Sequence, residues 1–182
     1  MIIRAATPAD LPACLSLDSS YRASQVWQMR MQWGDVMADG EEGVFISFRP
    51  VRLPRAVLLT PPGSRERLEA GWLRRALNLV IEEEGTIYGY LGMEVRPGQR
   101  LGWVEVMAFA QGKSLQGWDI RLVQAALDWG RLHGLRAVVL ETQARNTSAI
   151  ALAQQLGFSF SGYHEQYYDA AEVALFFTYS LE

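Results

Sequence analysis

A single acidic residue interrupts an apolar segment in the middle of the chain, L101-G-W-V-E-V-M-A-F-A110. The alternation predicts a strand whose Glu105 face also carries three large apolar side chains, Trp103, Met107 and Phe109. Burial among such side chains disfavours the charged form of a carboxyl group and raises its pKa. Glu105 could therefore accept a proton from an amine. The alternative interpretation is an ion pair with an arginine of a neighbouring strand.

The next segment, S114-L-Q-G-W-D-I-R-L-V-Q-A-A-L-D-W-G-R-L-H-G134, reads as a loop that enters an amphipathic helix. Free N–H groups at a helix start can bind a phosphate, and Gly117 permits close approach of the backbone. Asp119 would repel a phosphate by roughly 4 kcal/mol per charge pair, at about 4 Å and an effective dielectric constant near 20. The repulsion applies only if the carboxylate points toward the ligand, and the flanking Lys113 and Arg121 could offset part of it.

Strands and helices alternate along the rest of the chain in an order typical of an α/β fold. Strands are predicted at 2–6, 44–53, 78–85, 86–95, 101–110, 135–143, 158–167 and 172–180. Helices are predicted at 8–17, 64–76, 146–156 and within 114–134. Residues 24–33 fit a helix or a strand equally well. We therefore expect a single domain over residues 1–182, with a mixed, mostly antiparallel sheet flanked by helices.

Two details of these segments bear on the fold. Pro50 interrupts the strand at 44–53, which favours an edge position. The helix at 64–76 places Leu68, Trp72 and Ala76 on one face, which predicts that this face is buried.

The segment V139-L-E-T-Q-A-R-N-T-S-A-I-A-L-A-Q-Q-L-G-F158 resembles the last characteristic block of the GNAT superfamily of acyl-CoA-dependent N-acyltransferases. In that block a strand leads to an asparagine, an alanine three residues later and a helix that ends in L-G-F. The L-E-T-Q version is similar to the streptothricin acetyltransferase branch, as are L17-D-S-S-Y-R-A-S-Q-V-W27, V104-E-V-M-A-F109 and E172-V-A-L-F-F-T-Y179. The resemblance covers residues 1–25 and 77–182, while 26–76 match loosely.

This resemblance implies transfer of an acetyl group from acetyl-CoA to a primary amine of a small molecule, with Glu105 as the base. The residues implied to bind the cofactor are Met107, Phe109, Ser114, Gln116, Gly117, Trp118, Asp119 and Asn146. Those implied to line the acceptor groove are Asp18, Tyr21 and Glu141, with Gln143 on the same strand face as Glu141.

Structural roles compete with these assignments. Asn146 is also a good helix N-cap. Glu141 and Gln143 could be exposed polar positions near a strand end, and Asp18 could be an ordinary loop residue after a helix.

Two departures from the superfamily pattern bear on chemistry. The R/Q-x-x-G-x-G/A phosphate motif keeps Gly117, but Ser114 and Asp119 occupy its other two key positions. The tyrosine that usually protonates the departing thiolate is Ala153, and Tyr163, Tyr167 or Tyr168 could replace it. A GNAT-fold protein that has lost catalysis, and acts as a ligand-binding or regulatory module, is therefore the main alternative. A third is an enzyme that uses a different acyl donor in the same cleft.

Composition limits the partners and the cellular location that we expect for the protein. The net charge of −3 gives no general attraction for nucleic acid or an anionic membrane. The chain has no run of about 18 apolar residues that would span a membrane, and its beginning lacks a signal peptide's apolar core. One cysteine, Cys14, excludes an intrachain disulfide and is expected to be a buried thiol. We expect a cytoplasmic protein without a metal site, and the apolar residues 175–179 would permit a homodimer.

Overall fold

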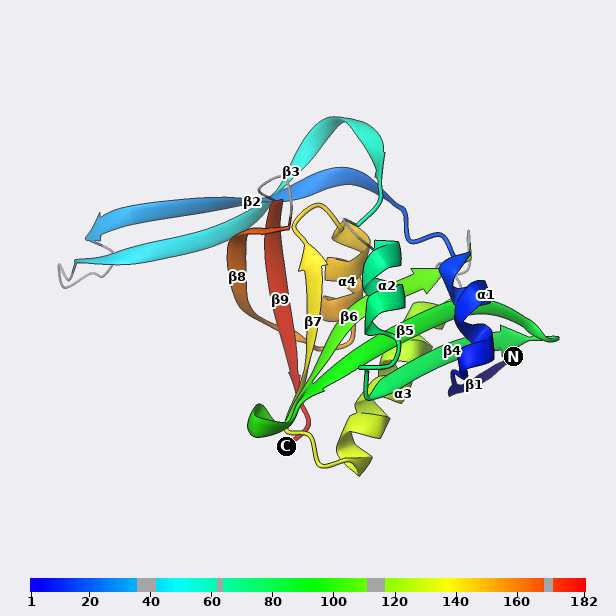
Figure 1. Cartoon of the computed structure of the whole chain (residues 1–182). Helices are drawn as coiled ribbons and strands as arrows, with labels where there is room; N and C mark the ends of the chain where they lie inside the picture. The colour runs from blue at the N-terminus through cyan, green and yellow to red at the C-terminus, as the bar shows by residue number, and fades with distance from the viewer. Residues whose placement is uncertain (36–41, 62–63, 111–116, 169–171) are drawn as a thin grey trace.

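The computed structural model describes residues 1–35, 42–61, 64–110, 117–168 and 172–182. Within this part of the chain, seven strands form one mixed sheet in the order β1-β4-β5-β6-β7-β9-β8, and β2 and β3 form a separate hairpin (Figure 1). Among the described strand pairs, only β6 and β7 run parallel. The predicted mixed, mostly antiparallel α/β fold is confirmed. The assignment of residues 1–182 to one domain stays a prediction.

The main sheet contains β1 (Ile2–Ala5), β4 (Leu77–Glu83), β5 (Thr86–Arg96), β6 (Leu101–Phe109), β7 (Ala137–Gln143), β8 (Ser159–Tyr168) and β9 (Glu172–Ser180). The hairpin consists of β2 (Tyr21–Asp35) and β3 (Glu42–Leu59). The helices are α1 (Leu11–Leu15), α2 (Ser64–Gly71), α3 (Trp118–Leu132) and α4 (Thr147–Gln155), and short 3-10 turns lie at Pro8–Asp10 and Pro97–Gln99.

Two hydrophobic clusters hold helices against the two faces of the sheet (Figure 1). The larger cluster joins α3 and α4 to the sheet and includes the fully buried Leu122 and Leu140. The smaller cluster lies under α1 and α2 and contains Cys14, Trp72 and Val106. Cys14 is buried as predicted, and burial raises the pKa of its thiol to about 12. A thiol in this environment is inert.

The hairpin settles the ambiguity at residues 24–33, which form a strand. Alternation along β2 pairs each large apolar residue with an apolar partner on β3. These pairs are Trp27 with Pro50, Met29 with Phe48, Met31 with Ile46, and Trp33 with Val44. The interruption predicted at Pro50 is wrong, because β3 continues through it to Leu59. Both strands of a two-stranded sheet are edge strands, where proline is tolerated.

Helix α2 ends at Gly71, five residues earlier than predicted. A side chain at residue 71 would collide with Arg75, since a Cβ there would lie 2.4 Å from the Arg75 Nη2 atom. Leu68 and Trp72 are buried as predicted, but Ala76 is exposed because the chain has left the helix before reaching it.

In the sequence order β8 comes before β9, but β9 lies between β7 and β8 in the sheet. Residues 175–178 therefore have a strand neighbour on each side, and Tyr179 pairs with β7. Among the described strands, β8 forms this edge of the main sheet. The homodimer stays a prediction, and a strand-to-strand contact at this edge would use β8.

Candidate active site

The two parallel strands at the centre of the sheet pair only over part of their length. Leu101 to Val104 of β6 pair with Ala137 to Leu140 of β7, and the described structure shows no pairing beyond that point. Glu105 and Glu141 are the first residues after the last pair. From Glu105 onward, the edge of β6 that faces β7 has no strand partner in the described part of the chain. Its backbone groups are available to a ligand.

A β-bulge at Glu105 reorients β6. Gly92 of β5 faces Val106 and Met93 faces Val104, so Glu105 is the extra residue. An extra residue reverses the in-and-out alternation beyond it.

The bulge changes which side chains share a face. Met107 and Phe109 pack against the same cluster as Val104, whereas Val106 belongs to the cluster under α2. The prediction that Glu105 shares a face with Met107 and Phe109, with Val106 opposite, is therefore wrong. Glu105 instead lies on the side of the sheet that α2 covers, where its carboxylate meets Arg75.

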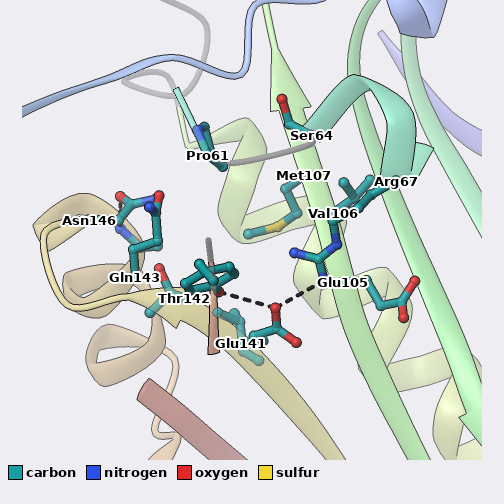
Figure 2. Close-up of a pocket in the computed structure, with 13 residues that line it drawn as sticks. Pro61, Ser64, Arg67, Glu105, Val106, Met107, Glu141, Thr142, Gln143 and Asn146 are labelled. Carbon is teal, nitrogen blue, oxygen red and sulfur yellow. Dashed lines mark hydrogen bonds and ion pairs between the residues drawn. The ribbon is translucent and has the colours of Figure 1, made fainter. Parts of the chain in front are cut away.

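Two cavities open where the strands separate. The smaller has a volume of about 80 Å³ and is lined by Glu105, Glu141, Arg67 and Tyr168, among others. The larger, about 500 Å³, extends past Phe109 to the start of α3. Met107, Asn146 and Ala149 line both cavities, so the two meet at these residues. Figure 2 shows the smaller cavity, with Glu105 on β6, Glu141 on β7 and Arg67 reaching in from α2.

Glu105 forms an ion pair with Arg75 and remains partly exposed. Its Oε2 atom lies 3.2 Å from Nη2 of Arg75, and 21% of its side chain is exposed. Burial raises the pKa of Glu105, and a hydrogen bond with Glu94 raises it further, while the charge of Arg75 opposes the shift. The predicted rise is confirmed in direction. The arginine partner comes from the segment after α2, not from a neighbouring strand.

Glu141 is enclosed by donors, and its side chain is only 1% exposed. Its carboxylate accepts hydrogen bonds from Arg67 at 2.9 Å, Trp103 Nε1 at 2.9 Å, Tyr167 at 2.8 Å and Tyr168 at 3.1 Å. A carboxylate has about four lone-pair sites, so these four hydrogen bonds fill them. The interpretation of Glu141 as an exposed strand-end residue is wrong. The donors leave its oxygens little capacity to bind an acceptor, and the predicted acceptor contact remains untested.

The start of α3 keeps part of the predicted phosphate site. Gly117 is the N-cap and has a positive φ of 75°, a conformation that glycine adopts without strain. Trp118 is a core residue, 6% exposed and packed edge-on against Tyr88 at 5.5 Å, so its side chain belongs to the core. The predicted contacts at Ser114 and Gln116, and Lys113 beside them, lie outside the described residues.

Asp119 lines the larger cavity, and its Oδ1 atom accepts a hydrogen bond from the Ile120 N–H at 2.9 Å. Burial raises the pKa of this carboxyl group. Asp119 thus lies beside the larger cavity, where its charge would oppose a bound phosphate.

Asn146 serves as the N-cap of α4. Its Oδ1 atom accepts the N–H of Ala149 at 3.1 Å. The amide nitrogen is not used by this cap, and the residue lines both cavities. Asn146 can therefore cap α4 and also contact a ligand. This differs from the expectation from the sequence that the two roles compete.

Asp18 and Tyr21 line the larger cavity, together with Phe109 and Asp119. The Asp18 carboxylate accepts the N–H of Ser20 at 2.8 Å. The Tyr21 hydroxyl donates to Gln143 Oε1 at 2.9 Å, and burial raises its pKa. These two predicted acceptor residues thus lie beside the larger cavity rather than beside Glu105.

The position of the tyrosine that usually protonates the thiolate is not accessible to a ligand. Ala153 is fully buried in the larger cluster. Of the three tyrosines considered as replacements, Tyr168 lines the smaller cavity. Burial raises the pKa of Tyr167 to about 12 and also raises that of Tyr168, and both hydroxyls donate to Glu141. Tyr163 packs against Phe48 of the hairpin instead.

Three residues of the site were missed by sequence reasoning: Arg67, Arg75 and Glu94. The two arginines lie in or just after a polar helix, where a charged side chain reads as solvent-exposed. Only the register of β5 against β6, in which Glu94 pairs with Trp103, brings Glu94 near Glu105. No local pattern in the sequence carries this information.

The described residues contain no group of three or more His, Cys, Asp or Glu side chains placed to hold a metal ion. In the same part of the chain, none of the helices combines the length and the apolar character that crossing a membrane requires.

Comparison with known proteins identifies relatives of this fold. The sequence model of the acetyltransferase (GNAT) family matches residues 53–158. No curated protein sequence matches the chain.

Three solved structures illustrate the structural similarity. Nourseothricin acetyltransferase superposes with a TM-score of 0.78 at 20% identity, over 100% of this chain and 98% of that one. An assigned streptothricin acetyltransferase from Bacillus anthracis str. Ames, in complex with acetyl coenzyme A, gives 0.77 at 16% identity, with the same coverage. The ribosomal-protein-S18-alanine N-acetyltransferase from Escherichia coli gives 0.67 at 19% identity, over 100% and 94%. At these identities the similarity shows the fold alone.

Proposed function

The chain belongs to the GNAT acetyltransferase family, and we propose that it transfers the acetyl group of acetyl-CoA to a primary amine of a small molecule. The observation that carries the proposal is the meeting of two cavities at Met107, Asn146 and Ala149, with Glu105 in the wall of the smaller one. One cavity suits the donor and the other the acceptor, and their junction suits the group that moves between them.

The larger cavity fits the donor. It runs from the junction along the unpaired edge of β6 to the N-terminus of α3, where backbone N–H groups favour a phosphate. We assign the contacts with acetyl-CoA to Met107, Phe109 and Asn146, which line this cavity, and to Gly117 at the start of α3. The cosubstrate supplies the acyl group as a thioester, and the structural relative solved with acetyl coenzyme A has the same fold.

The smaller cavity fits the acceptor. A lysine-like ammonium has a pKa of about 10.4 and must lose a proton before its nitrogen can attack. Glu105 accepts that proton on its carboxylate, directly or through water, and the neutral amine then attacks the acetyl carbonyl. The C–S bond of the thioester breaks as the amide forms, and coenzyme A leaves as a thiolate that takes up a proton from solvent. The raised pKa of Glu105 makes its carboxylate a stronger base than that of an exposed glutamate.

The test is an assay of the natural chain with acetyl-CoA and a panel of primary amines. Release of the coenzyme A thiol and mass spectrometry of the acetylated amine report turnover. Glu105→Gln keeps the shape of the side chain and should lower kcat/KM by about 10²–10⁴-fold, the usual contribution of a general base. Glu69→Gln makes the same change at an exposed position of α2 and should leave the rate unchanged. Equal rates for both variants would remove Glu105 from the mechanism.

A binding or regulatory module is the second candidate. Two observations favour it: Asp119 places a carboxylate beside the larger cavity, and Ala153 occupies the position of the usual acid. Calorimetry that shows bound acetyl-CoA, with no thiol released for any amine in the panel, would support this function instead.

A further inference from the structure

Arg75 is a buried arginine beside the proposed base. Its side chain is 1% exposed although it follows a polar surface helix. The guanidinium donates to the carbonyl oxygens of Arg67 at 2.7 Å and Leu68 at 3.0 Å, both in α2. It also donates to the Tyr90 hydroxyl at 3.5 Å and to the Glu105 carboxylate at 3.2 Å. The Arg75 side chain therefore links helix α2 to Glu105 through hydrogen bonds.

The surrounding chain is shaped around this side chain. A Cβ at Gly71 would lie 2.4 Å from the Arg75 Nη2 atom, and a Cβ at Gly92 would lie 2.6 Å from its Cδ atom. Trp72 and Tyr90 stack at 5.4 Å in the cluster next to it. A buried charge is costly unless its hydrogen bonds are supplied, and here two carbonyl groups and a carboxylate supply most of them. This is a built site, not a chance surface pair.

Helix α2 connects Arg75 to the other wall of the smaller cavity. Arg67, whose carbonyl oxygen Arg75 holds, donates from its own guanidinium to Glu141 at 2.9 Å. The two carboxylates that follow the last β6–β7 pair are thus both held from α2, Glu105 through Arg75 and Glu141 through Arg67.

We propose that Arg75 is a positioning residue. It fixes the Glu105 carboxylate in the wall of the acceptor cavity and sets its position relative to α2. The inference rests on the proposed acetyl transfer. It assigns Arg75 no contact with either substrate, because Arg75 lines neither of the two cavities.

The charged and titratable groups around Glu105 come from several elements. Arg75 and Arg67 are positive and oppose the rise of the Glu105 pKa, whereas the carboxyl group of Glu94 on β5 contributes to that rise. Tyr90 of β5 also interacts with Glu105, and its own pKa is raised to about 12 by burial, so it is neutral near pH 7. Glu141, with Tyr168, lines the facing wall. Removing the charge of Arg75 removes the nearest group that opposes the rise of the Glu105 pKa.

The test compares Arg75→Met and Arg75→Lys with Arg4→Met. Arg4 also binds two carboxylates, Asp10 at 2.7 Å and Glu82 at 2.6 Å, but on the first strand of the sheet. Arg75→Met should move the acidic limb of kcat/KM upward by about one pH unit or more, since a nearby opposite charge shifts a carboxyl pKa by about 1–3 units. Arg75→Lys keeps the charge but loses the forked geometry, so kcat should fall about 10–100-fold with a smaller pH shift. Arg4→Met should change neither quantity.

A carbon-13 NMR titration of the Glu105 carboxyl group gives a readout that needs no turnover. The Glu105→Gln spectrum assigns the signal. A titration midpoint that rises in folded Arg75→Met supports the inference even if no amine is acetylated, and in that case the proposed function alone fails. An unchanged midpoint in Arg75→Met overturns the inference. If that variant does not fold, an Arg75→Lys protein with the natural kcat and pH profile overturns it equally.

Discussion

The donor cluster around Glu141 leads to a prediction for the Glu141→Gln variant. The amide keeps the size of the side chain but has one acceptor oxygen in place of two, and its NH₂ group is a donor. Four donors now converge on this carboxylate, from Arg67, Trp103, Tyr167 and Tyr168. At least two of them must lose their partner.

The size of the effect follows from burial. Hydrogen bonds to a charged group contribute about 1.5–3 kcal/mol each. Arg67 is 32% exposed and can recover part of its loss from water, whereas the Glu141 side chain is 1% exposed and its site cannot admit solvent freely. Breaking a buried pair costs about 3–5 kcal/mol. For a chain of this size about 1 kcal/mol lowers Tm by roughly 2–4 °C, so we expect a fall of about 10 °C.

Thermal unfolding followed by circular dichroism measures this change, with Glu69→Gln as the matched control. The exposed Glu69 should tolerate the same substitution within about 0.5 kcal/mol. A Glu141→Gln protein with the natural Tm, but without acetyl transfer, would refute the reasoning. That result would assign Glu141 to the acceptor instead of to the cavity wall.

Three further predictions concern the cofactor side and stability. Asp119→Asn removes a charge from the larger cavity and should tighten acetyl-CoA binding by about 10–100-fold in calorimetry, with the gain shrinking as pH falls because burial raises the Asp119 pKa; equal affinities at all pH values would contradict this. Asn146→Ala removes the α4 cap and should cost about 0.5–2 kcal/mol in urea unfolding, whereas Asn146→Asp retains the cap oxygen and should be nearly neutral. Arg4 holds the pKa of Asp10 well below its usual range, so this pair stabilises the fold above about pH 4 and the contribution is lost as pH falls toward the folded-state pKa. Acid titration of stability should therefore be less steep in Asp10→Asn, and identical slopes would argue against the pair.

Local patterns predicted most of the elements but not the irregularities that build the site. Apolar alternation predicts β6, and the asparagine at residue 146 predicts the start of α4. Alternation cannot reveal the bulge at Glu105, because the extra residue is defined only by the register with β5. It also cannot reveal where β6 and β7 stop pairing, which is a contact between segments distant in sequence.

The early end of α2 also depends on tertiary contacts that a local sequence pattern does not reveal. The spacing of Leu68, Trp72 and Ala76 fits a longer helix, but the chain turns after Gly71 so that Arg75 can fold back beneath it. The competing effect is tertiary: a buried guanidinium bonded to two helix carbonyls outweighs another helical turn. Asp119 and Asn146 were recognisable as candidates from the sequence, yet only the structure shows that both line the larger cavity.

A crystal structure of the chain with acetyl-CoA tests the central claim most directly. The account predicts electron density for the extended thioester arm along β6 beyond Val104, with the acetyl group between Met107 and Ala149 and open toward the Glu105 carboxylate. Density for the cosubstrate outside the space between β6 and β7, or an acetyl group walled off from Glu105, would contradict it.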